Sequence, residues 1–73
     1  MENKSHLARI TGPVPYLSET GRKRNIPIGP CLVESIGGKS VDVVWGVSGQ
    51  RSVTLPVEEI EAARDQGRLM LVD

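Results

Sequence analysis

The chain has 73 residues, the size of one small domain, and residues 1–73 are predicted to form a single domain. Nine Lys and Arg residues balance nine Asp and Glu residues, and this zero net charge argues against a nucleic-acid binder that relies on a general basic excess. No apolar run approaches the roughly 18–20 residues of a membrane helix, and none follows residues 1–6, so we expect a cytoplasmic protein without a membrane span.

The first predicted strand covers residues 7–11 and follows a flexible tail at residues 1–5. Alternate residues of a half-buried strand face opposite sides of the sheet, so one alternating set should face the core. The sequence leaves open which set this is. The two possible inward-facing pairs are Ala8 with Ile10, and Leu7 with Arg9.

Residues 12–30 are predicted to form a long loop, which is unusual in so small a domain. Two prolines near its start fix φ and favour an extended chain, and a polar, turn-prone stretch follows them. Long loops often carry binding residues. The alternative is a solvated excursion that packs Tyr16, Ile26 and Ile28 across one end of the core.

Three further strands are predicted at residues 31–36, 40–46 and 51–55, because apolar and polar residues alternate there. A Gly-Gly pair follows the first and a Ser-Gly pair follows the second, so tight turns should join the three as hairpins. Trp45 is in line with two inward-facing valines, which favours a core position. A partly exposed Trp45 would instead form a platform for a peptide. Arg51 is in line with the inward-facing residues of the third strand.

A helix is predicted at residues 56–66, with Pro56 at its first helical position and Gly67 after its end. Its three glutamates suit the positive end of the helix dipole, which accounts for them without a catalytic role. Apolar residues at three-residue spacing predict one buried face. A closing strand follows at residues 69–72. The apolar residues are Val57, Ile60 and Ala63, and the glutamates are Glu58, Glu59 and Glu61.

Five strands with one short helix before the last strand predict an all-β domain that closes into a small barrel, because an open sheet of this size would expose its edges and one apolar face. The Gly37-Gly38 hairpin, the hairpin over residues 41–55 and the helix before the last strand resemble the SH3-like barrels over about residues 30–73. The resemblance implies binding of peptides, nucleic acids or other domains and does not specify which.

The sequence offers few groups for catalysis. His6 is the only histidine and Cys31 the only cysteine, so neither a Ser-His-Asp triad nor a structural zinc site is expected. Residues 38–40 read Gly-Lys-Ser, but a phosphate-binding loop needs a glycine where this chain has Val33, and a helix where a strand is predicted. We therefore expect no catalytic residue, no bound metal and no cofactor.

Residues 52–61 resemble the corresponding strand and turn of the plasmid-borne type II dihydrofolate reductases, which are SH3-like barrels that work as tetramers. In those enzymes the motif is Val-Gln-Ile-Tyr, and its Gln and Tyr contact the ligand. The matching stretch here is Val53-Thr54-Leu55, without the Gln or the Tyr. The residues that would carry this activity are missing, so an oligomeric reductase ranks last among the predicted functions.

Charge is distributed unevenly along the chain, although the total is zero. Residues 1–24 carry five basic and two acidic residues, whereas residues 57–73 carry two basic and five acidic ones. If the two patches lie far apart on the domain, they could meet between molecules, whereas adjoining patches would neutralise each other and contribute little to stability.

The candidate binding residues are Arg22, Lys23 and Arg24, with Tyr16 nearby in the sequence. We predict a non-enzymatic binding or interaction module that contacts a protein partner or a second copy of itself, because a chain this short without disulfides gains stability from association. The alternative is nucleic-acid binding, in which the basic residues hold phosphates and Tyr16 stacks on a base.

Overall fold

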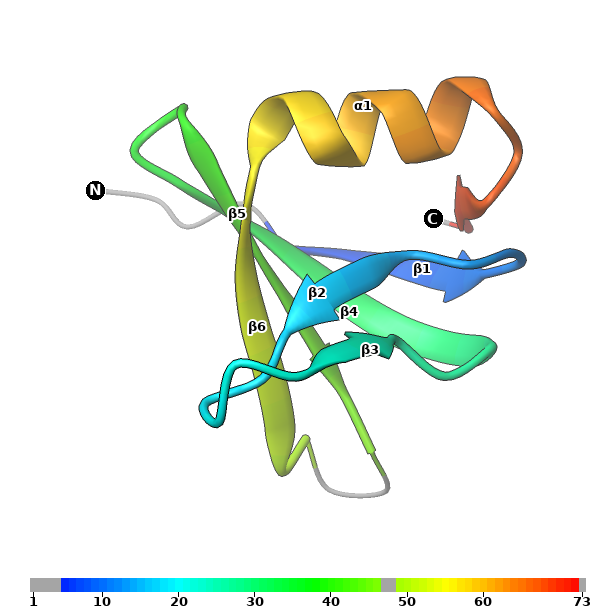
Figure 1. Ribbon diagram of the computed structural model, residues 1–73. Coiled ribbons are helices and arrows are strands. Elements are labelled where there is room, and N and C mark those ends of the chain that lie inside the picture. The colour runs from blue at the N-terminus through cyan, green and yellow to red at the C-terminus, as the bar shows by residue number, and fades with distance from the viewer. Residues whose placement is uncertain (1–4, 47–48, 73) are drawn as a thin grey trace.

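The computed structural model describes residues 5–46 and 49–72, and these residues contain seven strands and one helix (Figure 1). The elements are β1 (Ser5–Ile10), β2 (Pro15–Leu17), β3 (Lys23–Asn25), β4 (Gly29–Ile36), β5 (Ser40–Trp45), β6 (Arg51–Pro56), α1 (Val57–Asp65) and β7 (Leu69–Leu71). The predicted β-rich chain with a short helix before the last strand is confirmed. The predicted tail lies outside the described residues except for Ser5, which pairs with Glu34 in the sheet.

Five of the strands form one antiparallel sheet in the order β6-β5-β4-β1-β7. The predicted pairing of β4 with β5, and of β5 with β6, is confirmed. Residues 47–48, in the predicted Ser-Gly turn, lie outside the described residues. β1 lies between β4 and β7, so strands from the two ends of the chain are neighbours in the sheet.

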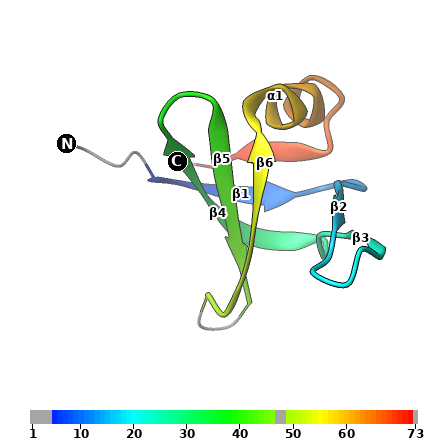
Figure 2. The same cartoon turned by 60° about the vertical axis from the view of Figure 1, so that its left-hand side comes forward.

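The sheet does not close into the predicted barrel, since no ladder joins β6 to β7 within residues 5–46 and 49–72. Instead α1 connects these two edge strands and packs against β5, β6 and β7 (Figure 2). Its Ile60 and Ala63 are buried in the core. The helix therefore covers the apolar face of the sheet that a closed barrel would have enclosed.

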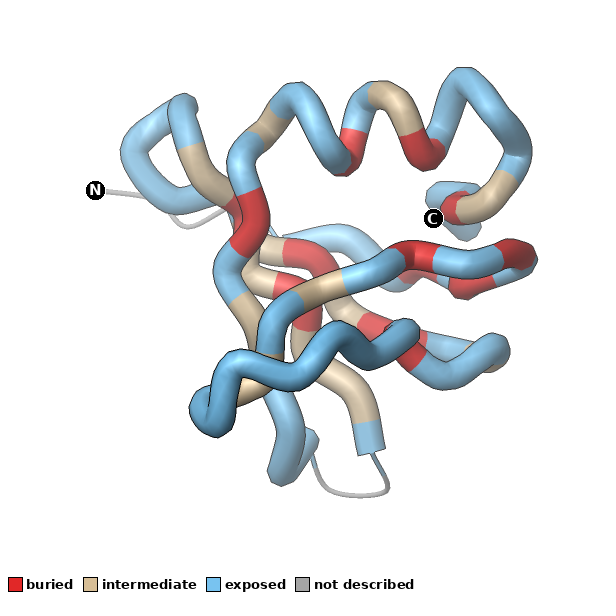
Figure 3. The backbone as a smooth tube through the Cα atoms, viewed as in Figure 1, coloured by how far each residue is buried: buried red, intermediate tan, exposed pale blue. Residues whose placement is uncertain are grey.

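The core lies between the sheet and α1, and we call the side of the sheet that faces α1 its inner face (Figure 3). Ala8 and Ile10 are buried whereas Leu7 and Arg9 are exposed, which settles the register that the sequence leaves open. Cys31 is buried opposite Ala8, as expected for a small hydrophobic residue. The buried residues are Ala8, Ile10, Val14, Ile26, Cys31, Val33, Val41, Val43, Leu55, Ile60, Ala63 and Leu69.

Residues 12–30 contain β2 and β3, which pair as a separate antiparallel hairpin where a long loop was predicted. Sequence periodicity missed these strands because a proline begins the first and polar residues fill the second. Val14 and Ile26 anchor the base of the hairpin: both are buried, and the Ile26 N–H donates to the Val14 carbonyl over 3.0 Å. Tyr16 is half-buried as expected, but the predicted packing of Ile28 is wrong, since that side chain is 71% exposed.

The helix begins one residue later than predicted. Pro56 is the last residue of β6 and pairs with Ser40, so it occupies the N-cap in an extended conformation and Val57 starts α1. The predicted buried face is confirmed, since Ile60 and Ala63 are buried and Val57 packs against the core.

Gly67 follows the end of α1, as predicted, and closes a Schellman motif. Its N–H donates to the Arg64 carbonyl over 3.1 Å, and the Arg68 N–H donates to the Ala63 carbonyl over 2.8 Å. Gly67 has a φ of +73°, where a Cβ costs about 1–2 kcal/mol.

We expect Gly67→Ala to lower the free energy of unfolding by about 1 kcal/mol in urea denaturation. Gly67→Asn should cost less, and an equal loss for both variants would contradict a conformational cause.

Candidate ligand-binding groove

Trp45 and Arg51 lie at the end of the β5–β6 hairpin that extends beyond the core. They are direct partners in the ladder, on the same face as Val43 and Val53. Along this face Val43 is fully buried, Val53 and Trp45 are half-buried, and Arg51 is exposed. The predicted core position of Trp45 therefore holds in part, because its indole packs against the core and also lines a surface hollow.

The β2–β3 hairpin brings Tyr16 and Arg24 to the same place. These two residues are direct partners in the ladder, and alternation places them on the face that carries Val14 and Ile26. Because Val14 and Ile26 are buried in the core, this face of the hairpin is turned toward the domain. Ser18 closes the turn at the tip of the hairpin. Its N–H donates to the Arg22 carbonyl, and its Oγ accepts a hydrogen bond from the Arg22 N–H.

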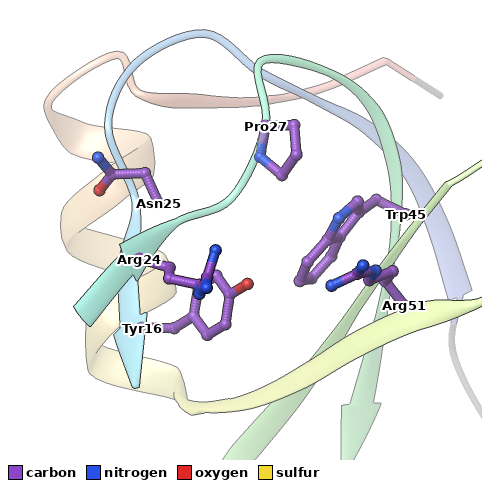
Figure 4. A pocket seen from close by; sticks show the side chains of 6 residues that line it. All are labelled: Tyr16, Arg24, Asn25, Pro27, Trp45 and Arg51. Carbon is purple, nitrogen blue, oxygen red and sulfur yellow. The ribbon is translucent and has the colours of Figure 1, made fainter. Parts of the chain in front are cut away.

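Tyr16 and Trp45 are the only aromatic residues of the chain, and they are in contact. Their ring centroids lie 5.6 Å apart with an interplanar angle of 62°. This is an edge-to-face geometry, which is one of the arrangements that aromatic pairs prefer. Both residues are half-buried, so part of each side chain faces solvent. Figure 4 shows Arg24 beside the Tyr16 ring and Arg51 beside the Trp45 indole. The pair joins two hairpins that are distant in sequence.

Two adjoining hollows of about 550 and 690 Å³ meet at this aromatic pair. Four residues line both: Tyr16, Arg24, Trp45 and Arg51. We call the surface around these four residues the aromatic groove. Ligand pockets in proteins commonly fall between about 300 and 1,000 Å³. The other lining residues are Asn25 and Pro27 in the first hollow, and Leu17, Ser18, Glu19, Thr20, Gln50, Ser52 and Val53 in the second.

Two guanidinium groups give the aromatic groove a positive rim. Arg24 and Arg51 are exposed, and no carboxylate of the described residues forms an ion pair with either of them. A guanidinium can bind a carboxylate or phosphate through two parallel hydrogen bonds. The groove can therefore hold an apolar or planar group against the rings and an anionic oxygen beside an arginine. Glu19, which lines the second hollow, limits how much negative charge fits there.

Of the four predicted binding residues, the structure places Tyr16 and Arg24 in the aromatic groove, whereas Arg22 and Lys23 do not line it. Lys23 pairs with Leu17, and alternation places both on the opposite face of the hairpin from Tyr16. A run of three basic residues does not act as one patch once it enters a strand, because successive side chains point to opposite sides.

Sequence reasoning missed Trp45 and Arg51 as partners of the predicted site. A signal was present, since Arg51 is in line with the inward-facing residues of its strand, where a charged side chain is unexpected. The sequence does not show that the β2–β3 hairpin crosses the domain at that point, because hairpin placement depends on the distant contacts of Val14 and Ile26.

Cys31 carries a buried thiol in this fold, and we expect it to react slowly. It is 6% exposed, and burial raises the pKa of the thiol above its usual value. We expect a disulfide reagent such as dithiobis(nitrobenzoate) to label the native protein far more slowly than the urea-unfolded chain. Because the folded state holds this proton more tightly, the contribution of Cys31 to stability should be constant below the unfolded pKa of about 8.5 and fall as the pH rises above it. Rapid labelling of the native protein would contradict this placement.

Within the part of the chain that the structure describes, no group of three or more His, Cys, Asp or Glu residues could hold a metal ion. No helix in the described ranges is long and apolar enough to cross a bilayer. The chain matches no protein-family model, no curated protein and no solved structure. The chemistry of the aromatic groove is therefore the basis for assigning a function.

Proposed function

We propose that the protein is a non-enzymatic binding module whose aromatic groove takes an extended segment of a protein partner, with an acidic side chain beside an apolar or aromatic one. The observation that carries this proposal is the convergence of both aromatic side chains of the chain, Tyr16 and Trp45, with two arginines that form no ion pair with a carboxylate of the described residues. Tyr, Trp and Arg are the residues enriched at the energetic centres of protein interfaces.

The charges favour a protein partner over a nucleic acid. Among the described residues that line the groove, only Arg24 and Arg51 carry positive charge, and Glu19 carries a negative charge there. A nucleic acid would contact several successive phosphates, which calls for a basic stripe. Two arginines instead suit one or two carboxylates.

The proposal includes an SH3-like architecture and a cytoplasmic location. The five-stranded sheet with a helix between the fourth and last of its strands supports the first, since this element order is the one on which the resemblance rests. The single buried Cys31 supports the second, because a chain without a disulfide suits a reducing compartment.

Fluorescence of Trp45, the only tryptophan, provides the test. The probes are short peptides that place Asp or Glu next to Leu, Pro or Tyr, compared with peptides of the same sequence in which Gln replaces each acid. We expect a saturable change in emission with acidic peptides and little with the Gln series. Arg24→Gln and Arg51→Gln should each weaken binding about tenfold, which corresponds to one charge-assisted hydrogen bond of about 1.4 kcal/mol.

Lys23→Gln is the matched control, because it removes the same charge from the neighbouring position on the other face of the hairpin. It should leave peptide affinity within twofold or so of the wild type. A short oligothymidylate is the competing probe. Tighter binding of that oligonucleotide, with a steep salt dependence and equal effects of Lys23→Gln and Arg24→Gln, would replace the proposal with the nucleic-acid alternative. No binding of either probe would refute a ligand site in the groove.

A further inference from the structure

The outer face of the five-stranded sheet carries a continuous apolar row. Leu7 lies directly opposite Leu32, and Leu32 directly opposite Val44. On the other side of β1, the Val72 N–H donates to the Leu7 carbonyl over 2.9 Å, which extends the same row beyond β7. These four residues, which we call the outer apolar row, therefore cross the sheet perpendicular to its strands.

The outer apolar row is open to solvent. Leu7 is 58% and Val72 is 61% exposed, and Leu32 and Val44 are half-buried. Both α1 and the β2–β3 hairpin send their buried residues into the core on the inner face, so neither of them covers this row. An antiparallel sheet with one solvated face normally presents polar residues there. Apolar residues aligned across three neighbouring strands and Val72 instead resemble a surface that packs against another sheet.

Opposite charges flank the two sides of the row. On one side of the row, two residues further along their strands, lie Glu34 and Asp42, which are direct partners in the ladder. On the other side, two residues along β1 from Leu7, lies Arg9, which is opposite Met70 and Pro30. Two residues of a strand span about 7 Å, so Arg9 and Glu34 of one chain are about 14 Å apart along the strand direction and cannot pair with each other.

We propose that the outer face is a homodimer interface, in which a second copy of this chain packs back to back with the twofold axis along the outer apolar row. Rotation about this axis exchanges the two flanks, so Arg9 of each copy faces the acidic flank of the other, one strand away from Glu34. Neighbouring strands are about 4.8 Å apart, which an arginine side chain spans. A twofold axis along the strands would place Glu34 and Asp42 against the same residues of the second copy, which like-charge repulsion disfavours.

This interface is independent of the aromatic groove, which lies between the two hairpins. A twofold contact uses the same patch on both copies, so an apolar row with opposite charges on its flanks is complementary to itself. Homodimer interfaces are more apolar than other protein surfaces, which fits the composition of the row. Dimerisation also adds stability to a small domain whose only cysteine is a free thiol.

Sedimentation velocity of the full chain over a range of concentrations up to millimolar tests the proposal. We expect a dimer, with Leu7→Lys weakening it by about 100-fold or more, as for a residue at the centre of an interface. Ile28→Lys is the control, because it places the same charge at a position that is 71% exposed and precedes β4, four residues before Leu32 of the row. Thermal unfolding of each variant reports whether the fold is retained.

A charge exchange tests the direction of the twofold axis. Arg9→Glu and Glu34→Arg should each weaken the dimer about tenfold, and the variant with both changes should recover most of the affinity. A wild-type monomer at millimolar concentration would overturn the proposal. So would a dimer that resists Leu7→Lys, or one that Trp45→Ala alone dissociates, since the groove would then be the interface. Failure of the charge exchange to restore affinity would overturn the proposed axis.

Discussion

Ile26→Ala should lower the free energy of unfolding by about 2–5 kcal/mol, the range for a fully buried isoleucine that leaves a cavity. Ile26 is 1% exposed and is one of the four largest fully buried side chains, together with Ile10, Val43 and Leu69. A chain of this length has a total stability of about 4–11 kcal/mol. The substitution should therefore remove a large share of the total, as measured by urea denaturation.

This substitution should also disturb the aromatic groove. Ile26 and Val14 attach the β2–β3 hairpin to the core, and the hairpin carries Tyr16 against Trp45. With the anchor shortened, we expect Trp45 emission to shift to longer wavelength in the folded protein as solvent reaches the indole. Ile28→Ala is the matched control, because it makes the same change two residues away at a position that is 71% exposed. Equal losses of stability in the two variants would contradict the anchoring role of Ile26.

Gly12→Ala should destabilise the protein by about 1–3 kcal/mol, because it overpacks a buried position. A Cβ at Gly12 would lie 2.8 Å from Cγ and 3.2 Å from Cβ of Arg68, and 3.3 Å from its Cα. Arg68 has little freedom to move away. Its Nη1 donates to the Pro13 carbonyl over 2.8 Å, and its own carbonyl accepts the N–H groups of Thr11 and Gly12 over 2.7 and 3.1 Å.

A double-mutant cycle with Arg68→Ala separates this clash from other causes. Arg68→Ala alone should be destabilising, because it removes the donor to the Pro13 carbonyl. It also removes the Cγ atom that a Cβ at Gly12 would meet, so the double variant should lose less stability than the sum of the two single losses. Additive losses in urea denaturation would show that the clash with Arg68 does not explain the cost.

The sequence by itself determined the elements whose residues alternate or repeat regularly. Period-two alternation placed β4, β5 and β6 and their pairing, and three-residue apolar spacing with Gly67 placed α1. These patterns are local, because a strand or helix buries one face whatever lies against it. The same alternation set Trp45 and Arg51 in line with buried residues of their strands.

Tertiary structure alone decided the register of β1, the open sheet and the groove. Ala8 and Ile10 face inward because β4 and β7 pair on either side of β1, a contact between distant parts of the chain. The sheet stays open because α1 packs over its inner face between the two edges. Tyr16 and Arg24 lie beside Trp45 and Arg51 only because the base of the β2–β3 hairpin is buried in the core. Such packing between distant parts of the chain produces no periodic pattern in the sequence.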